Sequence, residues 1–565
     1  MICREVKICL ISADLMRKLK TAFLRFKIHI LLLIALSIIV SSYQGKVISF
    51  HNTEEERHTD IFTMKIHDLI CANEVNNFYG ISIEKTLPVI QSLYESSQYH
   101  PVWTINYALN KDARNYINLL SNAHYYGLDT SEYHYESLKE LQYKLETEKN
   151  YLKLAELRME SEILLTHSSI RFITALQKGI LFERSACCVK DSSLYETIDF
   201  IAANLKNKNL VNAILASQPQ TLQYLRLQRA LEKYVKDLEL SKISNEFPDF
   251  NHDNAKANEL AKKILVYLSY AESLEMPEDY ALALMKFQKN NDLKQNRVLD
   301  KKTYKALLAI SEERLQKIAI NLERLRQDRW SAGNYILVNI PAYYLKVVEN
   351  NKEIAMYRTV IGKPVSPTPV FSSRISKIVT NPSWNVPRSI TNNEILYKAK
   401  TDTTYLIRNQ YVVYDEKNQE IHPDSINWAS LNSRNFNYRI IQKSSDQNAL
   451  GKLKFLFPNQ YSVYVHDTPS KRLFNKDYRA FSHGCVRLEN PHFLAEYIIK
   501  QQAIPNWEKQ LKRNLNRGIQ EIFILSKPID IHLRYFTCEA DEDGKIYYYE
   551  DIYELDEEIL IKLNS

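Results

Sequence analysis

The sequence predicts a multidomain chain of the α + β class, with an N-terminal membrane anchor, a long helical region and a C-terminal region built mainly from β-strands. Three observations support this prediction. An apolar run follows a basic stretch near the N-terminus, apolar residues then recur three and four positions apart, and after Gly333 their period changes to two. A chain of 565 residues is too long for one hydrophobic core, so three or four units are expected.

Composition argues against several classes of protein. The hydrophobic content of 45% and charged content of 25% are ordinary for a globular protein. The net charge of +7 is small for this length and no long Lys/Arg block occurs, so nucleic acid is not an expected partner. With only 10 glycines, the chain carries neither a GxxxxGKS/T nor a GxGxxG motif. We expect no cofactor. We expect no metal either, because the histidines other than His466 and His483 show no spacing typical of metal ligands.

The N-terminal segment is typical of a membrane-targeting signal. Residues 18–27 are basic and residues 28–44 are nearly all apolar. Because the positive charges precede the apolar run and no clear cleavage site follows it, we expect an uncleaved single-pass anchor in the inner membrane, with residues 1–27 in the cytoplasm. A cleaved signal peptide is the alternative. Either one places the rest of the chain in the periplasm, after a polar tether over residues 45–77.

The helical region divides into three parts. Residues 78–250 show helical periodicity and end in a polar, Pro-containing stretch. Residues 251–310 contain three short amphipathic helices, and residues 311–330 predict a linker helix with one apolar face.

The β region covers residues 331–525, with strands such as YILVN, YRIIQ, LKFLF and YSVYV. A helix is expected after it, with Asn490 as N-cap and Pro491 at the first helical position. We expect the acidic tail, residues 526–565, to form a strand and a loop on the domain surface, without a chemical role.

The β region contains a cysteine that could be a packing residue, half of a disulfide or a nucleophile. Five of the seven cysteines follow the apolar run; they are unevenly spaced and include no CxxC pair, unlike a disulfide framework. His466 ends a predicted strand, and Cys485 follows 19 positions later, so a strand–loop–strand path could bring them together. A thiol has an ordinary pKa of about 8.5, and a neighbouring imidazole can accept its proton. Gly484 would allow close approach of a substrate, and nearby backbone N–H groups could bind an oxyanion.

The string HDTPSKRLFNKDYRAFSHGCVRLENP is far more specific than the His–Cys pair alone. It resembles the active-site signature of the L,D-transpeptidase catalytic domain, and the upstream segments VIGKPVSPTPVF and NPSWNVP resemble that domain's leading strands. YHPVWT and YYGLDTSEY resemble the helical scaffold domain of large membrane-anchored L,D-transpeptidases. The three-helix unit resembles a peptidoglycan-binding module through Phe287-Gln288, Leu293 and Thr303, although Asp292 stands where that family has Gly.

The resemblance implies a role for each motif residue. Cys485 would be the nucleophile, His466 would activate it, and the carbonyl of Asp467 would orient the imidazole. Backbone N–H groups of His483, Gly484 and Cys485 would form the oxyanion hole. Ser482 and Arg487 would shape the loop, with Arg487 close to a substrate carboxylate; a purely structural Arg487 is the alternative. The insertion over residues 393–445 would cap the site.

The implied function is a peptidoglycan L,D-transpeptidase that forms 3→3 cross-links between stem peptides through a cysteine thioester. Its partners would be a donor tetrapeptide and an acceptor amine, which could be a second stem, a protein lysine or water. Two alternatives stay open: a cysteine peptidase or carboxypeptidase that trims wall peptides, and a non-catalytic scaffold that binds the wall.

Overall fold

The computed structural model describes residues 62–68, 77–78, 81–185, 192–237, 254–268, 270–328, 330, 333–402 and 404–564. The predicted cytoplasmic segment 1–27, the anchor 28–44 and most of the tether 45–77 lie outside these ranges. Among the helices that are described, none is both long enough and apolar enough to cross a bilayer. The chain divides into two compact units, Met1–Lys65 and Ile66–Ser565, and the second contains every element below.

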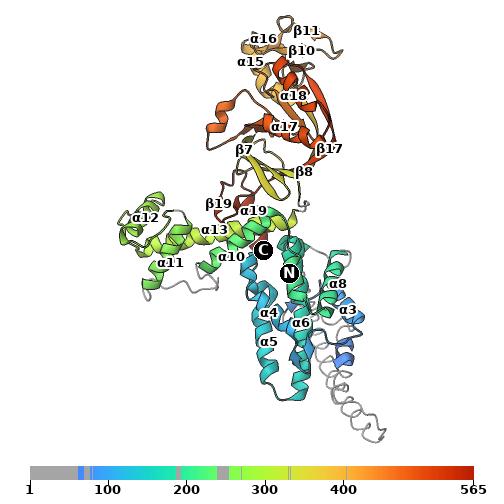
Figure 1. Ribbon diagram of the computed structural model, residues 1–565, viewed down its shortest axis with the longest axis vertical. Coiled ribbons are helices and arrows are strands. Elements are labelled where there is room, and N and C mark those ends of the chain that lie inside the picture. Colours follow the sequence, from blue (N-terminus) through green and yellow to red (C-terminus); the bar gives the residue numbers. More distant parts are fainter. Residues whose placement is uncertain are drawn as a thin grey trace, which may run out of the picture. The chain divides into compact units, whose positions relative to one another are not determined.

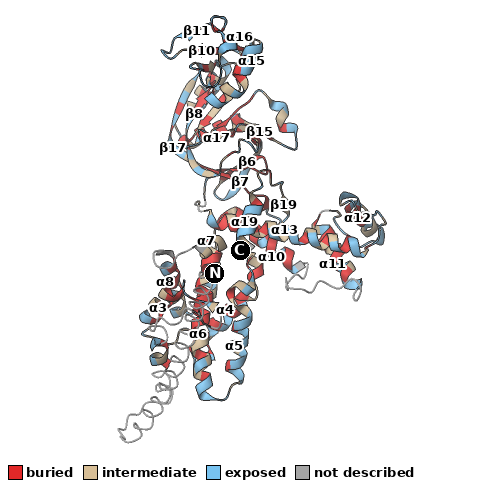
Figure 2. Ribbon diagram, turned by 180° about the vertical axis from the view of Figure 1, so that it is seen from behind, coloured by how far each residue is buried: buried red, intermediate tan, exposed pale blue. Residues whose placement is uncertain are grey.

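The first part of this unit is mainly helical and is organised around α6, whose central turns are buried (Figure 2). Asn150 caps α6 by accepting hydrogen bonds from the N–H groups of Leu152 and Lys153. The helices are α3 Leu87–Ser96, α4 Lys111–Leu120, α5 Tyr135–Thr147, α6 Tyr151–Lys178, α7 Ile180–Ser185, α8 Ser192–Lys206, α9 Leu210–Ala216 and α10 Leu222–Asp237, with 3-10 turns η2 Ala123–Tyr126 and η3 Thr130–Tyr133. Two short antiparallel pairs accompany them, β1 Asn77–Phe78 with β2 Ile81–Ser82 and β3 Thr104–Ile105 with β4 Ala108–Leu109.

The three-helix unit consists of α11 Asn254–Tyr267, α12 Pro277–Asn290 and the start of α13 Lys301–Gln327. Gln288 is fully buried and its amide donates to Asn296 Oδ1, the carbonyl of Val298 and Thr303 Oγ1, so it holds the turn between α12 and α13. Asp292 has a φ of +53°, a backbone conformation that glycine adopts most readily.

The linker helix differs from the expectation, because it is the second half of α13 and not a separate element. Asp300 caps the start of α13 by accepting from Thr303 N, and neither Pro nor Gly interrupts the following 27 residues. The boundary expected after residue 310 therefore falls inside one continuous helix.

A nine-stranded sheet forms the main part of the β region (Figure 1). Its strands, in sheet order, are β15 Ala480–Ser482, β7 Lys352–Gly362, β16 Val486–Leu488, β14 Val465–His466, β13 Leu453–Leu456, β8 Phe371–Thr380, β17 Glu521–Arg534, β5 Tyr335–Asn339 and β6 Tyr344–Glu349. Because β6 also pairs with β7, the sheet closes on itself. Helices α17 Pro491–Gln502 and α18 Trp507–Arg517 contribute Leu494, Ile498 and Leu511 to its core. The helix expected after Asn490 is confirmed, and Asn490 caps it.

The insertion forms a small subdomain with a core of its own, to which Val386, Trp428 and Ile440 belong. Its elements are β9 Trp384–Asn385, α14 Arg388–Ile390, the π-helical turn η4 Thr391–Ile395, α15 Leu396–Thr401, α16 Thr404–Arg408, β10 Tyr411–Tyr414, β11 Glu420–Ile421, η5 Pro423–Ser425, η6 Trp428–Ser430 and β12 Arg439–Gln442. Because β12 pairs with β9, the insertion begins near residue 384 and not at residue 393. The remaining 3-10 turn, η7 Lys471–Asn475, lies between β14 and β15.

The C-terminal tail also differs from the expectation. The expected boundary at residue 526 falls within β17, which pairs with both β8 and β5 and is therefore part of the main sheet. Beyond it follow a hairpin, β18 Cys538–Ala540 with β19 Ile546–Tyr548, and a helix, α19 Leu555–Asn564. Phe536 and Cys538 belong to a core cluster shared with α10–α13, so the tail is partly buried and not a surface loop.

Candidate active site

Strand register places His466 and the residues around Cys485 on one face of the sheet. Strand β14 pairs with β16 in parallel, with Val465 opposite Val486 and His466 opposite Arg487. Both valines are buried in the domain core. Side chains alternate along a strand, so His466 and Arg487 point to the other face. Cys485 lies directly before β16, and its thiol is close enough to Lys454, Arg487 and Tyr464 for their charges and hydrogen bonds to act on its pKa, which places it beside this face.

Two further side chains, Lys454 and Tyr464, belong to this face and were not predicted from the sequence. Lys454 pairs with His466 across β13 and β14, and its Nζ lies 3.9 Å from the centre of the Tyr464 ring. The Tyr464 ring meets the His466 ring edge-on, with centroids 5.5 Å apart. Tyr464 also lies beside the turn that carries Cys485, because its carbonyl accepts from Val486 N. Lys454 is placed here by the pairing of β13 with β14, whereas Tyr464 lies two positions before His466 in the chain.

His466 is held in one tautomer. Its Nδ1 lies 2.5 Å from the carbonyl oxygen of Asp467. Because a carbonyl oxygen can only accept, Nδ1 carries the proton and Nε2 keeps a lone pair. Burial, together with the charges of Arg487 and Lys454, lowers the pKa of His466 to about 3, against the opposing effect of the bond to the Asp467 carbonyl, so the ring is neutral at physiological pH. A neutral imidazole with a free Nε2 can accept a proton.

Cys485 is a partly exposed free thiol. Burial of the Cys485 sulfur raises the pKa of the thiol, while hydrogen bonds from Tyr464 and the charges of Lys454 and Arg487 oppose that rise. The thiol is therefore neutral at rest and needs a proton acceptor to become a nucleophile. Cys538, the other cysteine within the described ranges, is also free, so neither forms a disulfide there.

The turn that carries Cys485 is fixed by Ser482. Ser482 Oγ donates to the carbonyl of Cys485 at 2.6 Å and accepts from Gly484 N at 3.1 Å. Gly484 has a φ of +107°, which side chains rarely adopt. The expected oxyanion hole is corrected here: the N–H of Gly484 is already bonded to Ser482, which leaves the N–H groups of His483 and Cys485 as candidates.

Asp467 contributes more than the predicted carbonyl. Its carboxylate accepts from Lys452 N at 2.8 Å, from Thr468 N at 2.7 Å and from Lys471 Nζ at 2.6 Å. These bonds fix the backbone on both sides of the carbonyl that orients His466. The sequence analysis gave a role only to the carbonyl of Asp467, but the Asp467 side chain holds that carbonyl in place.

His483 and Arg487 face the insertion. His483 Nε2 lies 2.7 Å from Glu394 Oε1, in the π-helical turn η4, so the insertion directly contacts the turn that carries Cys485. No hydrogen bond from the Arg487 guanidinium is found within the described part of the chain, and its buried Nε has no partner. Arg487 therefore does not tie down the loop by hydrogen bonds. Trp384, at the start of the insertion, is half-buried against the core of that subdomain.

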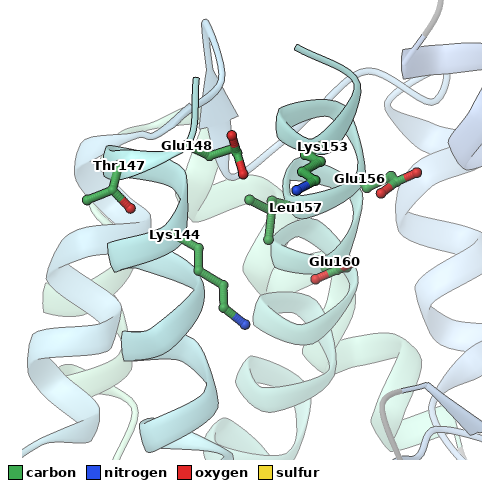
Figure 3. A pocket seen from close by; sticks show the side chains of 7 residues that line it. All are labelled: Lys144, Thr147, Glu148, Lys153, Glu156, Leu157 and Glu160. Atoms are coloured by element: carbon green, nitrogen blue, oxygen red, sulfur yellow. The ribbon is translucent and has the colours of Figure 1, made fainter. Parts of the chain in front are cut away.

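Elsewhere in the described ranges, no group of three or more His, Cys, Asp or Glu residues is placed to hold a metal ion. A separate surface pocket lies between the end of α5 and the start of α6 (Figure 3). It is lined by Lys144, Thr147, Glu148, Lys153, Glu156, Leu157 and Glu160 and contains neither a thiol nor an imidazole.

Comparison with known proteins finds similarity to one family over two parts of the chain. Residues 333–502 match the L,D-transpeptidase catalytic domain (YkuD), and residues 88–231 match the scaffold domain. A curated protein of Haemophilus influenzae, named "Putative L,D-transpeptidase", is 36% identical over 248 residues, which are 43% of this chain and 49% of that protein. The chain thus spans about half the length of this relative. A solved L,D-transpeptidase from Mycobacterium smegmatis is 14% identical with a TM-score of 0.16, over 36% of this chain and 59% of the other.

Proposed function

We propose that the chain is a peptidoglycan L,D-transpeptidase that forms 3→3 cross-links between stem peptides; the matches of residues 333–502 to the L,D-transpeptidase catalytic domain and of residues 88–231 to the scaffold domain support this. One observation carries the proposal. His466, fixed by Asp467 with a free Nε2, shares a sheet face with the partly exposed thiol of Cys485. This is the arrangement that a thiol with a raised pKa needs in order to act as a nucleophile.

The first half-reaction forms a thioester. His466 Nε2 takes the proton of Cys485, and the sulfur attacks the carbonyl of the third residue of a tetrapeptide stem. The oxyanion is stabilised by the N–H groups of His483 and Cys485. The imidazolium then donates its proton to the departing amine, and the terminal D-alanine leaves.

The second half-reaction releases the enzyme. The side-chain amine of a second stem attacks the thioester, loses a proton to His466 and forms the cross-link, which regenerates the thiol. The unpaired Arg487 guanidinium supplies a positive charge to a carboxylate of the stem peptide. The insertion, whose Glu394 contacts the turn that carries Cys485, restricts access of water and favours transfer over hydrolysis.

We also propose that the chain is held at the inner membrane by the apolar segment 28–44, with the catalytic domain in the periplasm. Cell fractionation tests this: the chain should stay in the membrane pellet in high salt and move to the soluble fraction when residues 1–44 are removed.

The function is tested by incubating the full-length chain with disaccharide-tetrapeptide and analysing the products by mass spectrometry. Dimers that lack one D-alanine are expected, and Cys485→Ala should form none. Shortened monomers alone would indicate a peptidase, and unchanged substrate would indicate a non-catalytic scaffold; either result would overturn the proposal.

A further inference from the structure

The C-terminal segment, residues 535–564, reaches the active-site region although it lies beyond both matched domains. Tyr553 makes the contact. Its hydroxyl donates to the carbonyl of Gly362 at 2.6 Å and accepts from Thr368 N at 3.1 Å. It thus bridges both ends of the loop that follows β7.

The same loop forms hydrogen bonds to the turn that carries Cys485, residues 482–485. Thr368 Oγ1 accepts from Gly362 N and donates to the carbonyl of Gly484, both at 2.9 Å. Lys363 N donates to the carbonyl of Ser482 at 3.0 Å. The loop packs closely against Gly362, because a Cβ on that residue would lie 2.2 Å from the carbonyl oxygen of Ser366. A change at Tyr553 is therefore transmitted to Thr368.

The carbonyl of Gly484 and the N–H of Cys485 belong to one planar peptide unit. The hydrogen bond from Thr368 to that carbonyl therefore sets the direction of the Cys485 N–H. In the proposed reaction this N–H is one of two donors to the oxyanion, and the strength of such a donor depends on its aim.

Tyr553 is itself rigidly held. Its backbone N–H donates to Tyr535 Oη at 2.8 Å, and the two rings stack with centroids 5.5 Å apart. Tyr535 in turn donates to Asp551 Oδ1 at 2.5 Å. The segment continues into α19, where Arg324 of α13 pairs with Asp556. A fixed support of this kind can hold a loop in one position.

We propose that Tyr553 is a positioning residue of the active site, which acts through Thr368 on the peptide unit between Gly484 and Cys485. The inference rests on the proposed function. A defect in the oxyanion donor slows acyl transfer but leaves the thiol itself as reactive as before. Loss of the Tyr553 hydroxyl should therefore slow acylation of Cys485 by a peptide donor while leaving alkylation of the same sulfur nearly unchanged.

The test compares Tyr553→Phe with Tyr547→Phe in the full-length chain. Both substitutions remove one tyrosine hydroxyl from the C-terminal segment, but Tyr547 is exposed on β19, and within the described part of the chain its hydroxyl bonds only to Asp541. Acylation by disaccharide-tetrapeptide gives kcat and KM, and alkylation of Cys485 by iodoacetamide, followed by peptide mass spectrometry, gives the reactivity of the thiol.

Tyr553→Phe should lower kcat about 10- to 100-fold with little change in KM, and should change the alkylation rate less than about twofold. Thr368→Val, which removes the hydroxyl that contacts Gly484, should reproduce this pattern, and the double variant should cost no more than the worse single one. Tyr547→Phe should match the wild type.

An unchanged kcat in Tyr553→Phe, or an equal fall of acylation and alkylation, would overturn the inference. If Tyr553→Phe does not fold, the rates of acylation and of alkylation are compared in Thr368→Val instead, and an equal fall of both rates would overturn the inference. If the wild-type chain is not acylated at all, the proposed function fails instead, so the two failures are distinguishable.

Discussion

His466 Nδ1 lies 2.5 Å from the carbonyl oxygen of Asp467, the residue that follows it in the chain. This contact assigns the proton to Nδ1 and leaves Nε2 as the acceptor on the face shared with Cys485. In its resting state His466 is therefore a proton acceptor.

The pH dependence of acylation should reflect a histidine with a very low pKa. Burial lowers the pKa of His466 to about 3, so the protonated ring is populated only at strongly acidic pH. We expect kcat/KM for acylation to stay nearly constant between pH 5 and 7. A fall with a midpoint near 6.5, the ordinary value for histidine, would contradict this account. His466→Gln should lower kcat about 10²- to 10⁴-fold, whereas His492→Gln, at an exposed position on α17, should not.

Lys454 should help to ionise the thiol. Its positive charge lowers the pKa of Cys485, in opposition to burial. Replacing it with the uncharged Lys454→Met should therefore shift the pH profile of iodoacetamide alkylation to higher pH and slow alkylation at pH 7. Lys452→Met is the matched control, because the side chain of that partly exposed lysine pairs with Asp446. An unshifted profile in Lys454→Met would show that the lysine has no effect on the sulfur.

Gly451 should be needed for the position of Asp467. It has a φ of +59°, and a Cβ there would lie 2.4 Å from Asp467 Cγ. Gly518 has a φ of +68° with no heavy atom near its Cβ position, so Gly518→Ala isolates the backbone cost, about 1–2 kcal/mol. Gly451→Ala should lose more stability than this in chemical denaturation and should also lower kcat. Equal losses in the two variants would exclude the predicted clash.

The secondary structure near the site was largely predictable from the sequence, but the neighbours of the reactive residues were not. Alternating apolar residues marked the strands around His466, and the local motif marked Cys485. Lys454 is 12 positions before His466 and on a different strand, so its place depends on register, which a single strand's pattern does not determine.

Long-range contacts account for the remaining differences. Nothing in the composition of the acidic tail indicates that Tyr553 bonds to a loop almost 200 positions earlier. The continuity of α13 was missed because the pattern of a three-helix module suggested a boundary, although no helix-breaking residue occurs there. The N–H of Gly484 donates to Ser482 Oγ because of the side-chain rotamer of Ser482. That rotamer is visible in the folded turn and not in the sequence.

Glu539 should make stability depend on pH. Burial raises the pKa of this carboxyl to about 7, above its ordinary value, and Asn339 and Arg226 only partly oppose the rise. The folded state thus binds this proton more tightly, so the free energy of unfolding should fall as pH rises from about 4.5 to 7, by roughly 3 kcal/mol in total. Glu539→Gln should flatten this part of the profile in urea denaturation. Glu550→Gln, at an exposed site, should retain it.

The central claim is that the sulfur of Cys485 carries the acyl group, and trapping that intermediate tests it most directly. The full-length chain is mixed with a disaccharide-tetrapeptide donor in the absence of acceptor, quenched in acid and analysed by intact-mass and peptide mass spectrometry. We predict an adduct equal to the donor minus D-alanine on the peptide that contains Cys485, and no adduct in Cys485→Ala. Turnover of the donor with no adduct on that peptide, or equal turnover by Cys485→Ala, would contradict the account.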